Sequence, residues 1–357
     1  MSAAKLRDYR TLGIEPLELA PAQLREAAVL YQSLQQERTP EDPLTPVEAI
    51  ERRLRADVPG QWRAFFGARD AGGALIGYAV VSRSLNEPEN AHLRWTELVV
   101  SAQHRQKGVG RALLRRLVDA VGDQGDDVVL MAQTMDRIPS GSEFARRIGA
   151  EPGLDMKTNQ LDLSRVDRAK VDEWAAVSPK GYRLERVDDT VPAELVAPYI
   201  QASNGMNDAP RGDLKMADWK LTEEQIRERE SWFKQTGTEW WLLVAVHEAS
   251  GEGAGFTEVT YDPKISHVIW QQGTAVIDAH RGHRLGMWMK AVMLKRILAE
   301  RPKALFIRTG NANTNAQMLG INTQLGFVQA WSACLWQISI ADARKAVGLV
   351  RVAGVAS

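Results

Sequence analysis

Cysteine is nearly absent from this sequence, and so are long apolar runs. The 357 residues include one cysteine, Cys334, so no disulfide can form within the chain and no cysteine-rich metal site is expected. The first residues lack the continuous apolar segment of a signal peptide, and no later stretch is apolar enough to span a bilayer. We therefore expect a cytoplasmic protein with no metal site and no membrane partner.

Neither sign of charge is in excess. Lys and Arg total 45, Asp and Glu total 45, and the formal net charge is +0. Nucleic acids attract proteins through clustered basic residues, and this balance gives no such signal, so we expect no nucleic-acid partner. The composition, 44% hydrophobic and 25% charged, is typical of a globular protein. Because 357 residues exceed what one hydrophobic core usually supports, we expect two domains.

The chain contains one pattern twice. The pair His280-Arg281 lies 176 residues after the pair His104-Arg105, about half the chain. Each pair follows a strand-like apolar run and precedes a helical pattern, a second strand-like run and a short helix that ends at glycine. The agreement of all five elements in order predicts a duplicated α/β domain with a mixed sheet and flanking helices.

The boundary between the two copies falls between Asp162 and Arg183. Alternating polar and apolar residues before it predict a closing strand, and turn residues at Ser178 precede a new strand. We expect an N-terminal domain at 1–165, a linker at 166–179 and a C-terminal domain at 180–357, each with its own core.

A glycine-rich loop, residues 105–110, precedes the helix of the first copy. Unpaired N–H groups at a helix start favour an anion, and glycines let the backbone approach a phosphate. Two known phosphate loops are excluded. A Walker motif needs Lys-Ser/Thr after its last glycine, where Arg111-Ala112 stands, and the dinucleotide fingerprint needs a third glycine where Leu113 stands. Apolar residues at helical spacing predict that the helix runs from Val109 to a stop at Gly122.

The pattern R-x-x-G-x-G between a strand and a helix, at residues 105–110, resembles the signature of the GNAT N-acetyltransferase superfamily. With the related loop R-G-H-R-L-G at residues 281–286, the chain resembles a bacterial tandem GNAT protein. The resemblance implies two tandem GNAT folds, each with a mixed, mostly antiparallel central sheet flanked by helices, and acetyl-CoA as co-substrate. It places the cofactor in the first half at Leu98, Val100, Arg105, Lys107, Gly108, Val109 and Gly110, and in the second at Thr274, Val276, Arg281, Gly282, Arg284, Gly286 and Asn315.

The two copies depart from the family pattern at opposite ends of the cofactor. Arg284 replaces the first signature glycine of the second loop, which makes that loop's geometry less assured because a Cβ is added. Asn315 stands where the family often has an asparagine that touches coenzyme A, whereas the first copy has Ile138 there.

Acetyl transfer to an amine needs a base, and the resemblance places two carboxylates near the thioester. Glu97, on the strand before the first loop, is the candidate general base, although a solvated strand carboxylate explains it equally well. The second half has Gly273 there, and Glu258 is its substitute. The family tyrosine that protonates the sulfur is replaced by Ala145 and Asn322, which leaves water or another tyrosine, such as Tyr261, as the acid.

These features favour an acetyl-CoA-dependent N-acetyltransferase that acts on an unidentified primary amine, a small molecule rather than a protein. Two alternatives stay open: a non-catalytic tandem module that binds coenzyme A, and a protein with one active and one structural domain. A homodimer is also compatible with the sequence.

Overall fold

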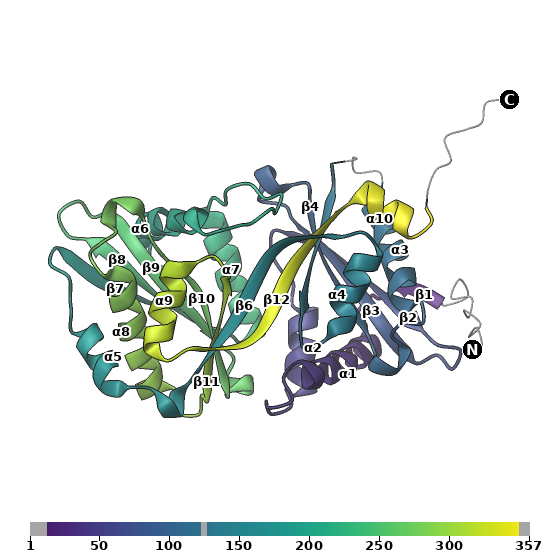
Figure 1. Ribbon diagram of the computed structural model, residues 1–357, viewed down its shortest axis with the longest axis horizontal. Coiled ribbons are helices and arrows are strands. Elements are labelled where there is room, and N and C mark those ends of the chain that lie inside the picture. The colour runs from purple at the N-terminus through teal and green to yellow at the C-terminus, as the bar shows by residue number, and fades with distance from the viewer. Residues whose placement is uncertain (1–12, 123–126, 350–357) are drawn as a thin grey trace.

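The fold is a long twisted sheet with helices on its faces, and it is known from a computed structural model that describes residues 13–122 and 127–349 (Figure 1). The first half consists of β1 (Gly13–Pro16), α1 (Pro21–Arg38), α2 (Val47–Arg55), β2 (Gln61–Arg69), β3 (Leu75–Ser84), β4 (Leu93–Val100), α3 (Val109–Val121), β5 (Val129–Met135), α4 (Pro139–Arg147) and β6 (Glu151–Asp162). The second half consists of α5 (Arg168–Ala175), β7 (Tyr182–Asp188), α6 (Ala193–Ser203), α7 (Glu223–Thr236), β8 (Glu239–His247), β9 (Gly253–Tyr261), β10 (Val268–Val276), α8 (Leu285–Glu300), β11 (Phe306–Ala312), α9 (Ala316–Leu325), β12 (Val328–Ser339) and α10 (Ile340–Ala346).

All twelve strands belong to one sheet, in the order β1-β2-β3-β4-β5-β12-β6-β11-β10-β9-β8-β7. This order is symmetric about its centre: each strand of the first half occupies the same place, counted from one edge, as the strand numbered six higher occupies when counted from the other edge. Among the strands of the described residues, only the pairs β4–β5 and β10–β11 are parallel. The sheet is therefore mixed and mostly antiparallel, and the duplication expected from the sequence is visible in its topology.

The last strand of each half lies in the other half. β12 pairs with β5 in antiparallel register from Ala333↔Met135 to Ser339↔Val129. β6 pairs with β11 in the same way, from Phe306↔Asp162 to Ala312↔Met156. β6 and β12 also pair with each other, and in Figure 1 they run as two long neighbouring strands between the two lobes. Each lobe is thus completed by the other half's final strand.

This exchange corrects the expected division into separate cores at 1–165 and 180–357. Ile338 and Ile340, from the end of the chain, pack in the core built on α3, while Leu161 and Trp174 pack in the core built on α8. The expected linker at 166–179 contains α5, which is fixed to α8 by a hydrogen bond from Trp288 Nε1 to the carbonyl of Ala175 at 3.1 Å. The boundary separates two repeats of the sequence but not two separately closed sheets; residues 1–12 and 350–357 lie outside the described part.

Helix α3 has the limits that the apolar spacing predicts. It spans Val109–Val121, follows Gly108 and ends at Gly122, which has a positive φ of 64°. Its buried side chains are the expected apolar stripe: Val109, Leu113, Leu114, Leu117, Val118 and Val121. This burial presses α3 onto the sheet and aims its N-terminus at the end of β4.

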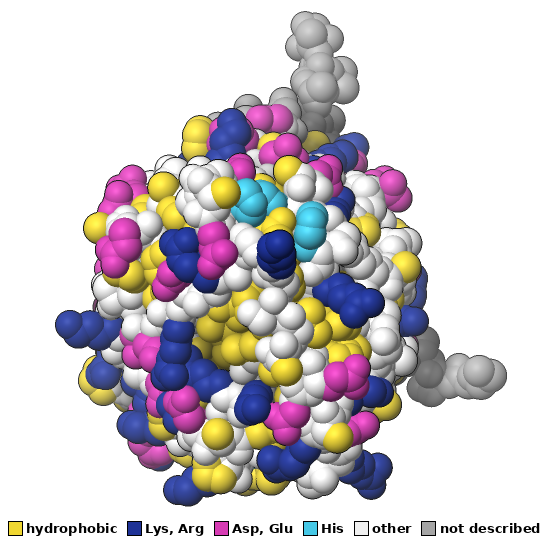
Figure 2. Space-filling model, turned by 90° about the vertical axis from the view of Figure 1, so that its left-hand side faces the viewer, with side chains coloured by type: hydrophobic (Ala, Val, Ile, Leu, Met, Phe, Trp, Pro, Cys, Tyr) yellow, Lys and Arg dark blue, Asp and Glu magenta, His cyan; other side chains and the backbone are white. Residues whose placement is uncertain are grey.

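Charged side chains cover the outside of the second half. Basic and acidic residues are interspersed over the face shown in Figure 2, in keeping with equal totals of 45 in the sequence. Among the described residues, no helix is long and apolar enough to cross a membrane.

The strand exchange predicts that one substitution near the C-terminus destabilises the first half. Ile340 is fully buried in the core with α3, so Ile340→Ala should lower the free energy of unfolding by about 2–4 kcal/mol. Urea denaturation followed by tryptophan fluorescence and circular dichroism should show one shared transition. As control, Val328→Ala, on a side chain of β12 that is 66% exposed, should change stability by less than about 0.5 kcal/mol. Two resolved transitions, with the first half unaffected by Ile340→Ala, would contradict the exchange.

Candidate functional site

A cavity opens where β4 leaves β5. The two strands pair in parallel only over Leu93–Trp95 and Val129–Met131. A hydrogen bond from Thr96 Oγ1 to the carbonyl of Met131, at 2.9 Å, is the last link between them. Beyond it lies a cavity of about 1040 Å³, bordered by α1, the start of α3, α4 and the exchanged strand β12.

The cavity combines the glycine-rich loop and the candidate base of the first half. Its wall includes Leu98, Val100, Arg105, Gly108 and Gly110, together with Glu97. Lys107 is exposed beside the cavity and Val109 is buried beneath the loop. The wall opposite β4 comes from the second half and includes Tyr261, His267, Trp270 and Arg308. None of the seven cofactor residues expected in the second half lines it.

The loop has the backbone that an anion site needs. Gly108 precedes α3 with a φ of 88°, in the left-handed region that favours glycine, and Gln106 adopts a φ of 57°. The first N–H groups of α3 have no helical acceptor and point toward the cavity end of the loop. Gly110 faces Phe144 of α4, where an added Cβ would lie 3.4 Å from the ring. The loop is therefore closed on one side by α4 and open on the other.

Arg105 holds the loop in place instead of offering an unpaired charge. Its guanidinium donates to both carboxylate oxygens of Glu37 on α1, at 2.6 and 2.8 Å, and its Nε donates to the carbonyl of Val100 at 3.0 Å. These bonds tie α1, β4 and the loop together. Arg105 therefore positions the loop through these contacts, and the neighbouring Lys107 is exposed.

The second loop keeps the same backbone with its glycine in a different place. Arg284 occupies the left-handed position of Gly108, with a φ of 61°, and Gly282 occupies that of Gln106, with a φ of 84°. Arg281 repeats the role of Arg105: its Nε donates to the carbonyl of Val276 and its NH2 donates to Asp208 at 2.6 Å. The added Cβ of Arg284 therefore does not alter the loop, although it stores local strain.

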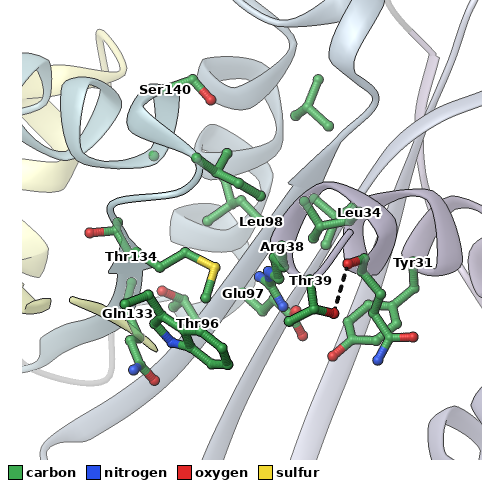
Figure 3. Close-up of a pocket in the computed structure, with 18 of the residues that line it drawn as sticks. Tyr31, Leu34, Arg38, Thr39, Thr96, Glu97, Leu98, Gln133, Thr134 and Ser140 are labelled. Carbon is green, nitrogen blue, oxygen red and sulfur yellow. Dashed lines mark hydrogen bonds between the residues drawn. The ribbon is translucent and has the colours of Figure 1, made fainter. Parts of the chain in front are cut away.

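Glu97 points into the cavity. Strand alternation places it with Tyr78 and Val99 on the face that α1 covers, while Leu98 and Val100 pack toward α3. Figure 3 shows its carboxylate between β4 and the end of α1. Burial raises the pKa of Glu97, and the nearby charge of Arg38 partly opposes this shift. No hydrogen bond or ion pair ties its carboxylate to another described residue, unlike most buried carboxylates.

Glu258, the expected substitute in the second half, is closed into a network. It is 7% exposed and accepts hydrogen bonds from Trp240 Nε1 at 2.8 Å, Tyr199 OH at 3.1 Å and Arg229 NH1 at 3.2 Å. It does not border the cavity. Its carboxylate is therefore held by three donors, one of them charged, as part of a structural ion pair.

The other residues expected to hold coenzyme A in the second half are engaged within the protein. Thr274 Oγ1 lies 2.7 Å from Thr257 Oγ1 in the bulged part of β10, and Asn315 caps α9 by accepting from the N–H of Met318 at 3.2 Å. Lys290, the sixth residue of α8, matches Leu114 of α3, which lines the first-half cavity. Lys290 is 3% exposed, and burial lowers its pKa to about 7.

Several residues of the cavity are absent from the sequence-based set. Tyr31 and Arg38 come from α1 and Arg53 from α2, a region without a recognisable motif. Asp42 pairs with Arg308 across the two halves at 2.5 Å and lies 3.5 Å from His267 Nε2. Burial alone would raise the pKa of Asp42, but His267 and Arg308 hold it well below its usual range. Only three-dimensional proximity reveals this group, because the partners are more than 200 residues apart.

Two further expectations concern the proton donor and metals. Ala145 lines the cavity without a hydroxyl, and Tyr261 lines its second-half wall. Asn322 is buried and donates to Asn311 Oδ1 at 2.9 Å, so it does not face the cavity. Across residues 13–122 and 127–349, no group of three or more His, Cys, Asp or Glu side chains is arranged to hold a metal ion.

Sequence comparisons relate the chain to acetyltransferases. Residues 27–148 match the acetyltransferase (GNAT) family model. Mycothiol acetyltransferase from Saccharopolyspora erythraea is 31% identical over 210 residues, which cover 54% of this chain and 59% of the relative. The enzyme of that name from Geodermatophilus obscurus is 30% identical over 212 residues, which cover 59% of this chain and 62% of the relative. The chain thus spans about three fifths of the length of these relatives.

Two solved structures share the whole architecture. A tandem GNAT protein from the clavulanic acid biosynthesis pathway superposes with a TM-score of 0.75 at 23% identity, covering 92% of this chain and 98% of its own. A GCN5-related N-acetyltransferase from Sphaerobacter thermophilus superposes with a TM-score of 0.64 at 15% identity. The superposition covers 95% of this chain and 97% of that protein. At these identities the likeness concerns the fold, and it confirms two tandem GNAT folds.

The left-handed residue of the second loop predicts a stabilising substitution. Arg284→Gly should raise the free energy of unfolding by about 0.5–1 kcal/mol, because relief of the left-handed strain exceeds the entropy that glycine adds to the unfolded chain. The matched change in the first loop, Gly108→Ala, should lower it by about 1 kcal/mol. Denaturant titrations of both variants and of the wild type measure the two changes in the free energy of unfolding. Destabilisation by Arg284→Gly would show that its side chain makes compensating contacts.

Proposed function

We propose that this chain, which has two tandem GNAT folds, is an acetyl-CoA-dependent N-acetyltransferase whose acceptor is a primary amine of small-molecule size. One observation carries the proposal: a single cavity contains the glycine-rich loop before α3 and the free carboxylate of Glu97. The family relationship supports acetyl-CoA as the donor. The related mycothiol acetyltransferases support an amine of small size.

The residues of the first half fit the donor. The N-terminus of α3 and the exposed Lys107 suit a pyrophosphate, and the edge of β4 beyond Trp95, which β5 does not pair, offers backbone groups to the pantetheine arm. When bound, acetyl-CoA supplies an activated acetyl thioester at the point where the two strands diverge. Leu98 and Val100 line the cavity at that point.

Glu97 acts in this proposal as the general base. A primary amine is mostly protonated near neutral pH, so its ammonium must lose a proton before nitrogen can attack a thioester carbonyl. Glu97 takes this proton directly or through one water. The C–N bond then forms and the C–S bond breaks, and water protonates the departing sulfur because Ala145 offers no hydroxyl. The raised pKa of Glu97 brings it closer to the pKa that a base needs at neutral pH.

We assign catalysis to the first half and a structural role to the second. The closed network around Glu258 and the buried Lys290 at the position of Leu114 support this division. The second half also contributes β12 to the first sheet and part of the cavity wall.

The donor site is tested by filling the first loop. Gly108→Trp should abolish acetyl-CoA binding in calorimetry, because a large side chain occupies the approach to the start of α3 and strains a left-handed residue. Gly73→Trp is the control, since Gly73 has a φ of 84° but stands in open space away from the cavity. Unchanged affinity and stoichiometry in Gly108→Trp would remove the loop from the site.

The base is tested by Glu97→Gln. Once an acceptor is in hand, kcat should fall by about 10²–10⁴, with acetyl-CoA affinity little changed. A base works only when deprotonated, so wild-type kcat/KM should rise with pH through the raised pKa of Glu97 and level off above it. In Glu97→Gln, kcat/KM should not rise with pH through the pKa of Glu97. It should rise only at higher pH, where the amine itself loses its proton. Glu258→Gln should keep its activity per folded molecule; full activity of Glu97→Gln together with loss in Glu258→Gln would assign catalysis to the second half.

A further inference from the structure

We propose that the acceptor amine carries an anionic group, a carboxylate or a phosphate, and that Arg38 binds it. The inference rests on the proposed function and names the substrate class of the same site. Arg38 is the last residue of α1 and lines the cavity on the side where Glu97 stands. Figure 3 shows the two side chains in the same part of the cavity, between α1 and β4.

Arg38 differs from the neighbouring cavity arginines in having no carboxylate partner. Arg53 pairs with Asp262 at 3.3 Å, Arg105 with Glu37 at 2.6 Å, and Arg308 with Asp42 at 2.5 Å. Among the described residues no salt bridge is formed by Arg38, and its Nε is buried without a hydrogen-bond partner. A half-buried guanidinium with an unsatisfied donor is costly unless a ligand completes it.

The backbone around Arg38 is fixed, so its side chain is presented from a rigid base. The carbonyl of Arg38 accepts from Arg137 NH1 at 2.8 Å, and the same guanidinium donates to Glu41. The Arg38 guanidinium carbon lies 5.9 Å from the centre of the Tyr31 ring. Burial and the charge of Glu97 raise the pKa of Tyr31, whereas the charges of Arg38 and Arg53 and a side-chain hydrogen bond with Arg38 oppose that shift. Both arginines therefore lie near the Tyr31 ring, and the Arg38 Nε stays without a partner.

The other arginines on the acceptor side of the cavity already have carboxylate partners. Arg53 binds Asp262 together with Arg52, whereas Arg308 binds Asp42 and lies 4.0 Å from Glu41. Arg38 has no such partner among the described residues and is therefore the guanidinium left for an anionic ligand. Guanidinium groups recognise carboxylates and phosphates through two parallel hydrogen bonds, which gives both affinity and orientation.

The position of Arg38 relative to Glu97 restricts the acceptor further. Both side chains line the same cavity, and although burial raises the pKa of Glu97, the charge of Arg38 is close enough to oppose that shift. An ammonium held at Glu97 and an anion held at Arg38 would therefore lie within a few bonds of each other. The structure assigns the acceptor to short amino acids, amino phosphates, or larger molecules that end in such a group.

The test compares amines that differ only in this charge. Glycine and β-alanine are measured against their carboxamides, and ethanolamine phosphate against ethanolamine. Binding to protein saturated with coenzyme A is followed by fluorescence of the cavity residues Trp95, Trp270, Trp331 and Trp336, and turnover by coenzyme A release from acetyl-CoA. Wild type should prefer the anionic member of a pair by about 10- to 100-fold, because charged hydrogen bonds are the strong ones.

Three variants assign the preference to Arg38. Arg38→Met should remove it, and Arg38→Lys should keep part of it. Neither should change the affinity for acetyl-CoA, which separates this role from binding of the cofactor's own phosphates. Arg55→Gln is the control, because Arg55 carries the same charge on the exposed side of α2, outside the cavity.

The outcomes separate this inference from the proposed function. A preference for anionic amines that depends on Arg38, without coenzyme A release, would keep the anion site and overturn the acetyltransferase assignment. Release of coenzyme A at equal rates with the anionic amines and with their neutral partners would keep the acetyltransferase assignment and overturn the anion site at Arg38. A panel in which no anionic member binds more tightly than its neutral partner, including one in which nothing binds, overturns the role of Arg38.

Discussion

The separation of β4 from β5 after Trp95 is the constraint on which the rest of the structure depends. Two neighbouring strands ordinarily satisfy their polar backbone groups along their whole shared length. Here parallel pairing stops at Trp95 and Met131, and each strand is held by its other neighbour: β4 by β3, and β5 by β12. The edges that face the gap stay open to a ligand. The glycine-rich loop, Glu97 and the cavity all lie around this gap.

The strand exchange joins the duplicated halves into one twelve-stranded sheet, because β12 pairs with β5 and β6 pairs with β11. In the second half β10 and β11 pair in parallel only over Val268–Trp270 and Phe306–Arg308, so a gap opens there as it does between β4 and β5. The side chains at the gaps are free to diverge. Leu114 in one half corresponds to Lys290 in the other, and Met131 to Arg308, which pairs with Asp42. The second half keeps the backbone of a GNAT fold, while Arg308 takes part in the seam between the halves.

Local patterns made much of the fold predictable. The limits of α3, the left-handed glycine before it and the repeated order of elements each depend on residues close together in sequence. The exchange of β6 and β12 was not predictable. As copies of one ancestral strand, they are both suitable antiparallel partners for β5 and β11, and no pattern of alternation distinguishes the two pairings.

The candidate site was predictable in its backbone and not in its charges. The signature places Arg105 beside a phosphate, but only the fold shows that Glu37, 68 residues earlier, already takes up its guanidinium. The network around Glu258 depends on the fold in the same way, since Tyr199, Arg229 and Trp240 reach it from three other elements.

The buried pair between Asp42 and Arg308 shows what such long-range contacts contribute. Removing two charges from water offsets most of the energy of their attraction, so this pair adds little net stability compared with apolar residues of the same size. It does fix geometry, because a bidentate contact tolerates little rotation and joins the α1–α2 loop to β11. That loop follows directly after Arg38. The second half therefore acts on the site of the first by holding the segment from which Arg38 extends into the cavity.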